Sequence, residues 1–157
     1  MEILSAQQLI DCDHSSWGCH GGLYTNAYEY AINNSIMTEE DYPYTGVQQD
    51  CTYDEAKGVA QASSFINILP HDVNQLKMAV KLGPVATSIS TNNKVFQFYK
   101  GGVISTSDCS KVDTPVDSAV TIVGYGHDDT LNQDYWLIKN SWGISWGEKG
   151  FARVSIK

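Results

Sequence analysis

The chain has 157 residues, of which 42% are hydrophobic, and a formal net charge of −8 from 18 acidic and 10 basic side chains. This length allows one domain with a sizeable core and is small for two complete domains. The basic residues form no stripe and no apolar run is long enough to span a bilayer. The composition therefore argues against a nucleic-acid partner and against a membrane span.

The first part of the chain predicts two short helices around a glycine-rich loop. Ser5, with Gln8 three residues later, predicts a capping box that opens a helix over residues 6–12. Residues 13–22 hold three glycines and several polar turn formers, which predicts a loop that a ligand's main chain could approach closely. Apolar and aromatic side chains then recur every three or four residues over 23–32, which predicts an amphipathic helix.

The second part predicts a change from helices to strands. Residues 59–69 favour a strand and residues 73–82 a helix that stops at a Gly-Pro pair. Five β-rich runs then predict a small antiparallel sheet or barrel, namely 85–90, 102–105, 118–125, 134–139 and 151–156. Helices followed by strands indicate the α+β class. We expect residues 1–82 to form the helical part with the crossover, and residues 83–157 to form the β-rich part.

Residues 136–151 hold the densest concentration of functional side chains. This segment begins as an apolar strand and ends as a loop of glycines and tryptophans, with the polar Asn140 between them. An amide at a strand end, flanked by indole rings, can hold an imidazole by its ring N–H. The alternative is a hairpin whose tryptophans only fill a core. Spacing alone leaves both interpretations open.

The cysteines indicate the compartment of the protein. Cys12, Cys19, Cys51 and Cys109 lie at irregular spacing and form no C-x-x-C pair, which favours a secreted disulfide framework over a cytosolic redox pair. Residues 33–35 read Asn-Asn-Ser, a formal acceptor for N-linked glycan that agrees with such a compartment.

Residues 12–20 gather side chains that could bind a metal. Cys12, His14, Cys19 and His20 fall within nine residues, and all four side chains can bind zinc. Their order, Cys-x-His-x4-Cys-His, has neither of the paired spacings of structural zinc sites. We therefore predict no metal site and no cofactor.

Seven motifs, in order and at similar spacing, resemble the papain-like cysteine peptidases of the cathepsin group over nearly the whole chain. They are residues 4–12, 18–22, 42–44, 83–85, 99–103, 123–126 and 139–143. The resemblance implies a papain-like fold, with a partial helical left lobe and an antiparallel, β-barrel-like right lobe. Members of this family are lysosomal or secreted. Residues 1–8 lack a basic stretch followed by an apolar run, so we expect no signal peptide in this chain, and its localisation stays unknown.

The resemblance also assigns catalytic positions. Enzymes of this kind need a Cys thiolate as nucleophile, a His as base, an Asn that orients the His, and donors for the oxyanion. Asn140 matches the orienting Asn, but Ser118 stands where the His is expected. A hydroxyl cannot act as a base near neutral pH. The family's Cys and Gln belong to a segment placed before residues 4–12, and we expect that segment to be absent here. Asn140 is then a vestige of the catalytic set.

The four histidines of the chain could in principle replace the missing base. None of them occupies a strand position that faces Asn140 in this interpretation, so we expect surface or loop histidines at all four positions: His14, His20, His71 and His127.

The resemblance implies a groove for an extended peptide. Backbone groups of the glycine pair would bond to the peptide, as when a strand is added to a sheet edge. The implied groove residues are Gly21, Gly22, Leu23, Ser88, Val116, Asp117, Ala119, Trp142 and Trp146. The alternative is that these residues only pack the seam between the lobes.

The resemblance implies one disulfide, between Cys12 and Cys51. Cys19 and Cys109 would then be unpaired, because their family partners lie outside this chain. Two orphaned thiols suggest a fragment, a degenerate copy, or a chain that another polypeptide completes. We expect a protein or peptide partner to complete the helical lobe, because the inner faces of Leu9, Leu23, Ala27, Trp142 and Trp146 would otherwise be exposed.

Two functions remain. The first is a catalytically inactive homologue, a pseudopeptidase that acts as a binding or structural subunit. The second is a truncated fragment of an active papain-like cysteine endopeptidase that hydrolyses peptide bonds. Ser118 favours the first, because an active parent would keep a His there. In either case we expect no catalysis by this chain alone. The sequence does not identify the partner.

Overall fold

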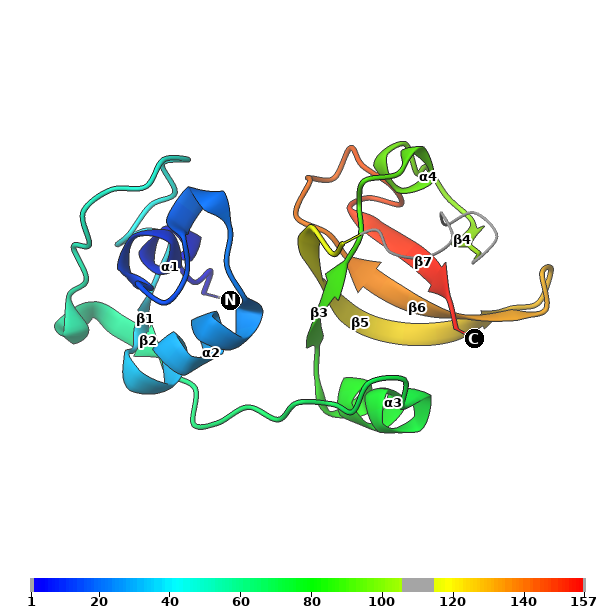
Figure 1. Ribbon diagram of the computed structural model, residues 1–157, viewed down its shortest axis with the longest axis horizontal. Helices are drawn as coiled ribbons and strands as arrows, with labels where there is room; N and C mark the ends of the chain where they lie inside the picture. The colour runs from blue at the N-terminus through cyan, green and yellow to red at the C-terminus, as the bar shows by residue number, and fades with distance from the viewer. Residues whose placement is uncertain (1, 106–114, 157) are drawn as a thin grey trace. The chain divides into compact units, whose positions relative to one another are not determined.

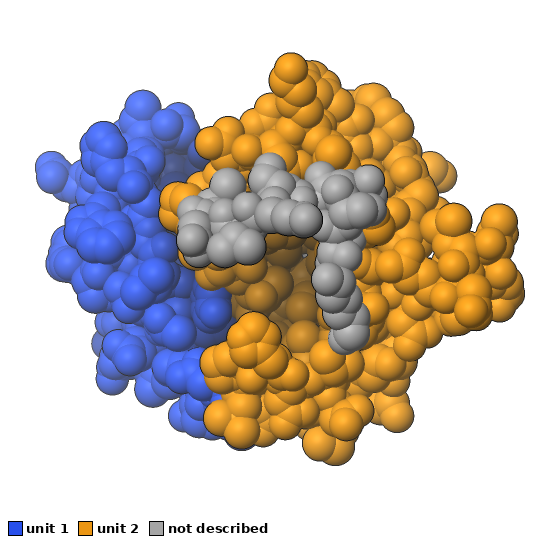
Figure 2. Space-filling model, turned by 45° about the vertical axis from the view of Figure 1, so that its right-hand side comes forward, with its two compact units in different colours: residues 1–67 blue, residues 68–157 orange. Residues whose placement is uncertain are grey.

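The computed structural model describes residues 2–105 and 115–156. The chain divides into two compact units, Met1–Asn67 and Ile68–Lys157, which Figure 1 draws as ribbons and Figure 2 in two colours. No helix among the described residues is both long and apolar enough to cross a membrane.

Unit 1 is mainly helical. Its elements are α1 (Ala6–Cys12), the 3-10 turn η1 (Gly18–His20), α2 (Tyr24–Asn33), β1 (Ile36–Met37), the 3-10 turn η2 (Glu55–Lys57) and β2 (Gly58–Ala60). Strands β1 and β2 pair antiparallel. Both predicted helices are confirmed to within one residue at each end.

The strand predicted over residues 59–69 is wrong beyond Ala60. Within the described chain, residues 61–69 belong to no helix or strand, and the backbone N–H of Ala62 donates to the carbonyl of Ala31. The apolar side chains of this run are not buried, since Ile66 is 86% exposed. A run without a buried face has no reason to join a sheet, whatever its β propensity.

The predicted capping box on α1 is half formed. The Ser5 hydroxyl accepts the backbone N–H of Gln8 at 3.0 Å, as predicted. The Gln8 side chain does not reach back to Ser5; its amide donates to the Tyr30 hydroxyl and the Ser35 carbonyl, and its oxygen accepts the Met37 N–H. Gln8 is fully buried, and a buried amide is stable only when its donors and acceptors are paired. The tertiary contacts of the Gln8 side chain therefore replace its expected hydrogen bond to the Ser5 backbone N–H.

The disulfide Cys12–Cys51 joins the end of α1 to the loop before η2, with the two Cα atoms 4.9 Å apart. Cys12 also packs with Met37 and Tyr42 in the small core of unit 1. This pairing was implied by the family resemblance and is present in the structure. Cys19 is exposed and free, and Cys109 lies outside the described residues.

Removing the disulfide should lower the stability of the folded chain. The two cysteines are 39 residues apart, and closing a loop of that size is worth about 3 to 4 kcal/mol. We expect the double variant Cys12→Ala/Cys51→Ala to lose about that much free energy of unfolding in urea denaturation. The matched control is Cys19→Ala, which should unfold like the original chain. A Cys19–Cys109 peptide pair in unreduced mass mapping would contradict this fold.

Unit 2 is a five-stranded sheet with two helices. Its elements are α3 (Val73–Leu82), β3 (Val85–Ile89), α4 (Lys94–Gln97), β4 (Val103–Ile104), β5 (Ser118–Asp128), β6 (Gln133–Lys139) and β7 (Phe151–Ser155). The strand order is β3-β5-β6-β7-β4. All neighbours pair antiparallel except β4 and β7, which are parallel, so the expectation of a purely antiparallel sheet is corrected.

Helix α3 belongs to unit 2, although the sequence pattern grouped it with the chain before residue 83. The reason is packing: Leu76 and Val80 on α3 lie against the buried core of this sheet. That core consists of Phe96, Tyr99, Ile104, Val120, Ile122, Ile138, Trp146 and Ala152. Helix α4 was not predicted; it begins where the Asn93 side chain accepts the Phe96 N–H at 2.8 Å.

Candidate functional site

The candidate site is one end of the β5–β6 ladder. Thr121 of β5 is the register partner of Lys139, the last residue of β6. Ser118 begins β5 and Asn140 directly follows β6, so both residues lie beyond this pair at the same end of the two strands. Because β5 and β6 are antiparallel, two residues that are 22 positions apart in the sequence lie at the same end of the sheet.

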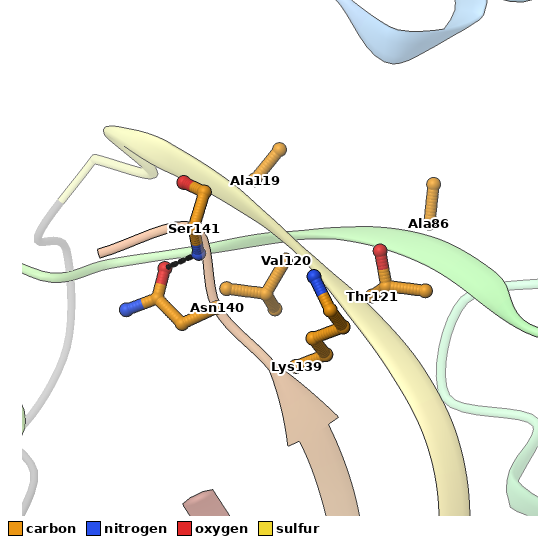
Figure 3. Close-up of a pocket in the computed structure, with 7 residues that line it drawn as sticks. All are labelled: Ala86, Ala119, Val120, Thr121, Lys139, Asn140 and Ser141. Carbon is orange, nitrogen blue, oxygen red and sulfur yellow. Dashed lines mark hydrogen bonds between the residues drawn. The ribbon is translucent and has the colours of Figure 1, made fainter. Parts of the chain in front are cut away.

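Asn140 is buried, with 5% of its surface exposed, and only part of its side chain is satisfied. Its backbone N–H donates to the Gly150 carbonyl at 3.0 Å, and its Oδ1 accepts the Ser141 N–H at 2.8 Å. The amide nitrogen Nδ2 has no hydrogen-bond partner among the described residues. Figure 3 shows Nδ2 pointing away from Ser141. A buried donor without an acceptor costs about 1 to 3 kcal/mol, and such exceptions call for a specific explanation.

Ser118 is held in place through its backbone and its neighbour. It pairs with Ile89 of β3, and within the described chain its hydroxyl makes no hydrogen bond. The preceding Asp117 accepts the backbone N–H of Thr91 at 2.7 Å and the Thr91 hydroxyl at 2.9 Å. The Thr91 N–H is the main reason that the pKa of Asp117 lies below its usual value. Asp117 therefore ties the start of β5 to the end of β3.

The two tryptophans after Asn140 have different environments. Trp146 is 7% exposed, donates from Nε1 to the Phe96 carbonyl at 3.0 Å, and has ring contacts to Phe96, Tyr99 and Trp142. Trp142 is 41% exposed and packs edge-on against Phe96. The expectation that both rings would be uncovered is wrong for Trp146, because residues of α4 and its C-terminal flank cover it. Trp146 is core, and Trp142 is the partly open ring.

A small pocket lies on the sheet beside Asn140, with a volume of about 160 Å³. Figure 3 shows its seven residues, with Ala119 and Thr121 on one side of β5 and Val120 and Asn140 on the other. Its lining residues come from β3, β5, β6 and the turn after β6: Ala86, Ala119, Val120, Thr121, Lys139, Asn140 and Ser141. The pocket offers hydroxyl and amine groups that can hydrogen-bond to a ligand.

Two of the seven pocket residues were among the site residues expected from the sequence. Ala119 and Asn140 were predicted site residues, whereas Thr121, Lys139 and Ser141 were not. The alternation of β5 puts residues 119 and 121 on one face, and the hairpin register would have added Lys139. Of the other expected groove residues in unit 2, Ser88 is the exposed cross-strand partner of Ala119, and Val116 is exposed ahead of β5.

The remaining expected groove residues lie in unit 1, in the loop before α2. Gly21 has a φ of +117°, and its carbonyl accepts the Trp17 N–H at 2.9 Å. Gly22 is exposed, and its N–H and C=O make no hydrogen bond within the part of the chain described. A Cβ on Gly22 would lie 2.6 Å from the Ser16 hydroxyl, so this position requires glycine. Leu23 is exposed beside it. Among the residues that the structure describes, the main-chain donor and acceptor of Gly22 therefore stay without a partner.

The four histidines have different settings in the structure. His14 and His20 belong to unit 1, and His71 precedes α3 with a φ of +64°. His127 lies toward the far end of β5, with its Nδ1 2.8 Å from Asp134 Oδ1. None of these rings hydrogen-bonds to Asn140 in the described residues. There, too, no three His, Cys, Asp or Glu side chains come together as metal ligands.

His127 should titrate above its ordinary value. The hydrogen bond to Asp134 is the main reason that the pKa of His127 is raised, and the same bond lowers the pKa of Asp134. The contribution of His127 to stability is therefore complete below about pH 6.5 and is lost as the pH rises through its folded pKa. Asp134 contributes above about pH 4 and loses its contribution as the pH falls. We therefore expect His127 and Asp134 to be charged together between about pH 4 and about pH 6.5.

An NMR titration of the imidazole ring measures this. Asp134→Asn should move the pKa of His127 back toward its ordinary value. Asp129→Asn is the control, because Asp129 lies 3.9 Å from Nε2 and makes no hydrogen bond to the ring, so its removal should cause a smaller change. An unchanged pKa of His127 in Asp134→Asn would rule out the proposed interaction between His127 and Asp134.

Comparison of the sequence with known proteins identifies relatives from one family. The family described as "Papain family cysteine protease" matches residues 1–157. Cathepsin L of Sarcophaga peregrina is 39% identical over 156 residues, which are 97% of this chain and 45% of that protein. Cathepsin L2 of Homo sapiens is 36% identical over 158 residues, which are 97% of this chain and 47% of that protein.

Two solved structures match at the level of the fold. The ragweed pollen allergen Amb a 11, a cysteine protease in its proform, has a TM-score of 0.88 and 39% identity, over 97% of this chain and 45% of that one. Digestive procathepsin L 3 of the Tenebrio molitor larval midgut has a TM-score of 0.88 and 39% identity, over 98% of this chain and 50% of that one. The expected α+β, papain-like fold is confirmed. The chain spans about half the length of the curated relatives that it matches.

Proposed function

This chain belongs to the papain family of cysteine proteases, and we propose that it is a catalytically inactive member, a pseudopeptidase, which binds an extended peptide or protein segment without cleaving it. The observation that carries the proposal is Ser118, the first residue of β5, at the position where the family's motif has its histidine. A serine hydroxyl has no basicity near neutral pH, so it cannot take a proton from a thiol and return it to a leaving amine.

The surroundings of Asn140 support this proposal. In a working triad, the third residue holds the base in one orientation by a hydrogen bond to its ring. Here Asn140 Oδ1 already accepts the Ser141 N–H, and the buried Nδ2 has no acceptor among the described residues. The amide is placed as an orienting group, but no ring in the described chain is bonded to it. We infer that Asn140 remains for its role in the turn that ends β6.

Binding is proposed from open main-chain and apolar groups. The N–H and C=O of Gly22 make no hydrogen bond within the described residues, and such groups suit an extended segment because strand addition is stabilised by main-chain hydrogen bonds. In unit 2, taken by itself, Ala119 is exposed beside its register partner Ser88, and Val116 is exposed before β5. No metal or cofactor enters this proposal.

A protein partner is part of the proposal. Ile3, Trp17 and Leu23 of unit 1 each expose more than half of their surface. Large exposed apolar side chains are common at sites of association. Sedimentation velocity at increasing concentration should show self-association or, with the partner present, a defined complex. A strictly monomeric chain that binds no dye for apolar surfaces would oppose it.

The second candidate is a part of an active endopeptidase. The observation that favours it is length, since the chain covers only 45% to 47% of the curated relatives. Ser118 distinguishes the candidates, because an active parent needs a base at that position whatever else it contains. Sequencing the transcript that encodes the chain would show whether Ser118 stands in every copy.

The test of the proposal is a peptide that is bound and recovered intact. Extended apolar peptides should bind by titration calorimetry, and mass spectrometry after long incubation should find them uncut. Gly22→Pro and Gly22→Ala form a matched pair, since both crowd Ser16 but only proline removes the N–H. Binding should fall further in the proline variant. Cleaved peptide, or equal binding in both variants, would contradict the proposal.

A further inference from the structure

The Asn-Asn-Ser sequence at residues 33–35 is not used by the function proposed above. It is the single N-x-Ser/Thr site in the chain, because no other asparagine is followed two residues later by serine or threonine. Asparagine in such a site accepts N-linked glycan in secreted proteins. We propose that Asn33 is a glycan acceptor, and that the glycan is added before residues 53–60 pack over Ser35. This inference does not depend on whether the chain is a pseudopeptidase.

Asn33 is accessible in the folded chain. It is the last residue of α2 and is exposed, and its Nδ2 donates at 2.8 Å to the carbonyl of Glu29, one turn earlier. A helix C-terminus on the surface has room for a bulky polar group. Asn34, by contrast, is half-buried, and its side chain donates to the Tyr30 carbonyl at 3.1 Å. The position of the acceptor asparagine is therefore compatible with a glycan on the finished fold.

Ser35, unlike Asn33, is covered by other parts of unit 1. Its hydroxyl lies 2.8 Å from the Tyr53 hydroxyl, and its carbonyl accepts the buried amide of Gln8. The backbone of Gly58 in β2 lies directly over it, so that a Cβ on Gly58 would overlap the Ser35 side chain. The transferase must recognise this hydroxyl together with Asn33 in an open chain. In the folded chain this hydroxyl is engaged by Tyr53 and lies against Gly58, so we place the transfer before β2 pairs with β1.

The disulfide independently supports folding of the chain in an oxidising compartment. Cys12–Cys51 links α1 to the segment just before Tyr53. Disulfides of this kind form in oxidising compartments such as the lumen of the endoplasmic reticulum, where N-linked glycan is also added. The bond would draw residues 51–60 toward α1 and help to bury Ser35. Glycan transfer and disulfide formation would then compete in time.

The chemistry is a substitution at an anomeric carbon. The donor is an oligosaccharide linked through its C1 to a lipid pyrophosphate. Asn33 Nδ2 forms a bond to C1, the bond from C1 to the pyrophosphate oxygen breaks, and one amide proton passes to a base of the transferase. The lipid pyrophosphate leaves with the electron pair. The asparagine keeps one N–H, so it retains a donor for hydrogen bonding.

The test compares the folded and unfolded chain as acceptors. Purified chain, either oxidised and folded or reduced and unfolded, is given to a solubilised oligosaccharyltransferase with a lipid-linked oligosaccharide. We expect the unfolded chain to be modified at Asn33, and the folded chain to react at least about tenfold more slowly, because it must first open locally. Enzymatic deglycosylation, which converts the modified asparagine to aspartate, locates the site by mass spectrometry.

Three variants make the result specific. Asn33→Gln should abolish modification, and Asn34→Gln should leave it unchanged. Gly58→Ala, which pushes the segment off Ser35, should make the folded chain a faster acceptor. Absence of modification on the unfolded chain, or modification that persists in Asn33→Gln, would overturn the site. Equal rates for folded and unfolded chain would overturn the order of events.

Discussion

Purified chain is expected to hydrolyse a fluorogenic dipeptide no faster than buffer does. Removing the nucleophile or the base of a catalytic triad lowers kcat by roughly a million-fold, and what remains comes from binding and oxyanion stabilisation. In our proposal Ser118 stands at the position of the base, and of the described cysteines Cys12 and Cys51 form a disulfide, whereas Cys19 is free and exposed. On this proposal we therefore expect neither a base nor a thiolate paired with Asn140 among the described residues.

Substitution separates a missing base from a missing nucleophile. Ser118→His restores an imidazole at the start of β5, but we expect it to remain inactive in this chain, because no described thiol is paired with that position. Cys19→Ala is the control for chance reactivity and should change nothing. Dipeptide hydrolysis by the original chain that a cysteine-directed alkylator abolishes would disprove the pseudopeptidase proposal. The same activity in Ser118→His alone would show that a thiol is available and that only the base is missing.

Trp146→Ala should be among the most destabilising substitutions in unit 2. The side chain is almost fully buried among Phe96, Tyr99 and Trp142, and the Phe96 carbonyl would lose the indole N–H. Truncating a buried tryptophan costs about 3 to 5 kcal/mol, from lost transfer free energy and from the cavity left behind. Urea denaturation followed by circular dichroism should show a loss of that size in the free energy of unfolding.

Two further variants separate the contribution of the buried ring of Trp146 from that of its indole N–H. Trp146→Phe keeps a ring but removes the N–H, and should lose an intermediate amount that includes about 1 to 3 kcal/mol for the unpaired Phe96 carbonyl. Trp142→Ala is the matched control, since this ring belongs to the same cluster but is 41% exposed, and its removal should cost clearly less. Equal losses for Trp142→Ala and Trp146→Ala would show that burial does not separate the two tryptophans.

The sequence by itself determined the features that depend on local order. Ser5 caps α1, Asp72 caps α3 and Gly83 follows its end, so helix bounds could be predicted from capping and periodicity. The strands after residue 84 were found because turn formers separate short β-rich runs. The order of motifs from residue 4 to residue 143 was enough to identify the family and, through it, the α+β fold and the Cys12–Cys51 bond.

Only the tertiary structure decided the features that depend on distant partners. Gln8 was expected to close a capping box, but Tyr30 and Met37 offered it bonds within the core. Trp142 and Trp146 are the same residue type in one loop, and contacts with α4 and Tyr99 bury only the second. The physical reason is the same in both cases. A sequence pattern records what a side chain can do, whereas burial and hydrogen bonding depend on which groups the fold brings against it. Asn140 shows this, because its Oδ1 accepts the Ser141 N–H while its Nδ2 has no partner among the described residues.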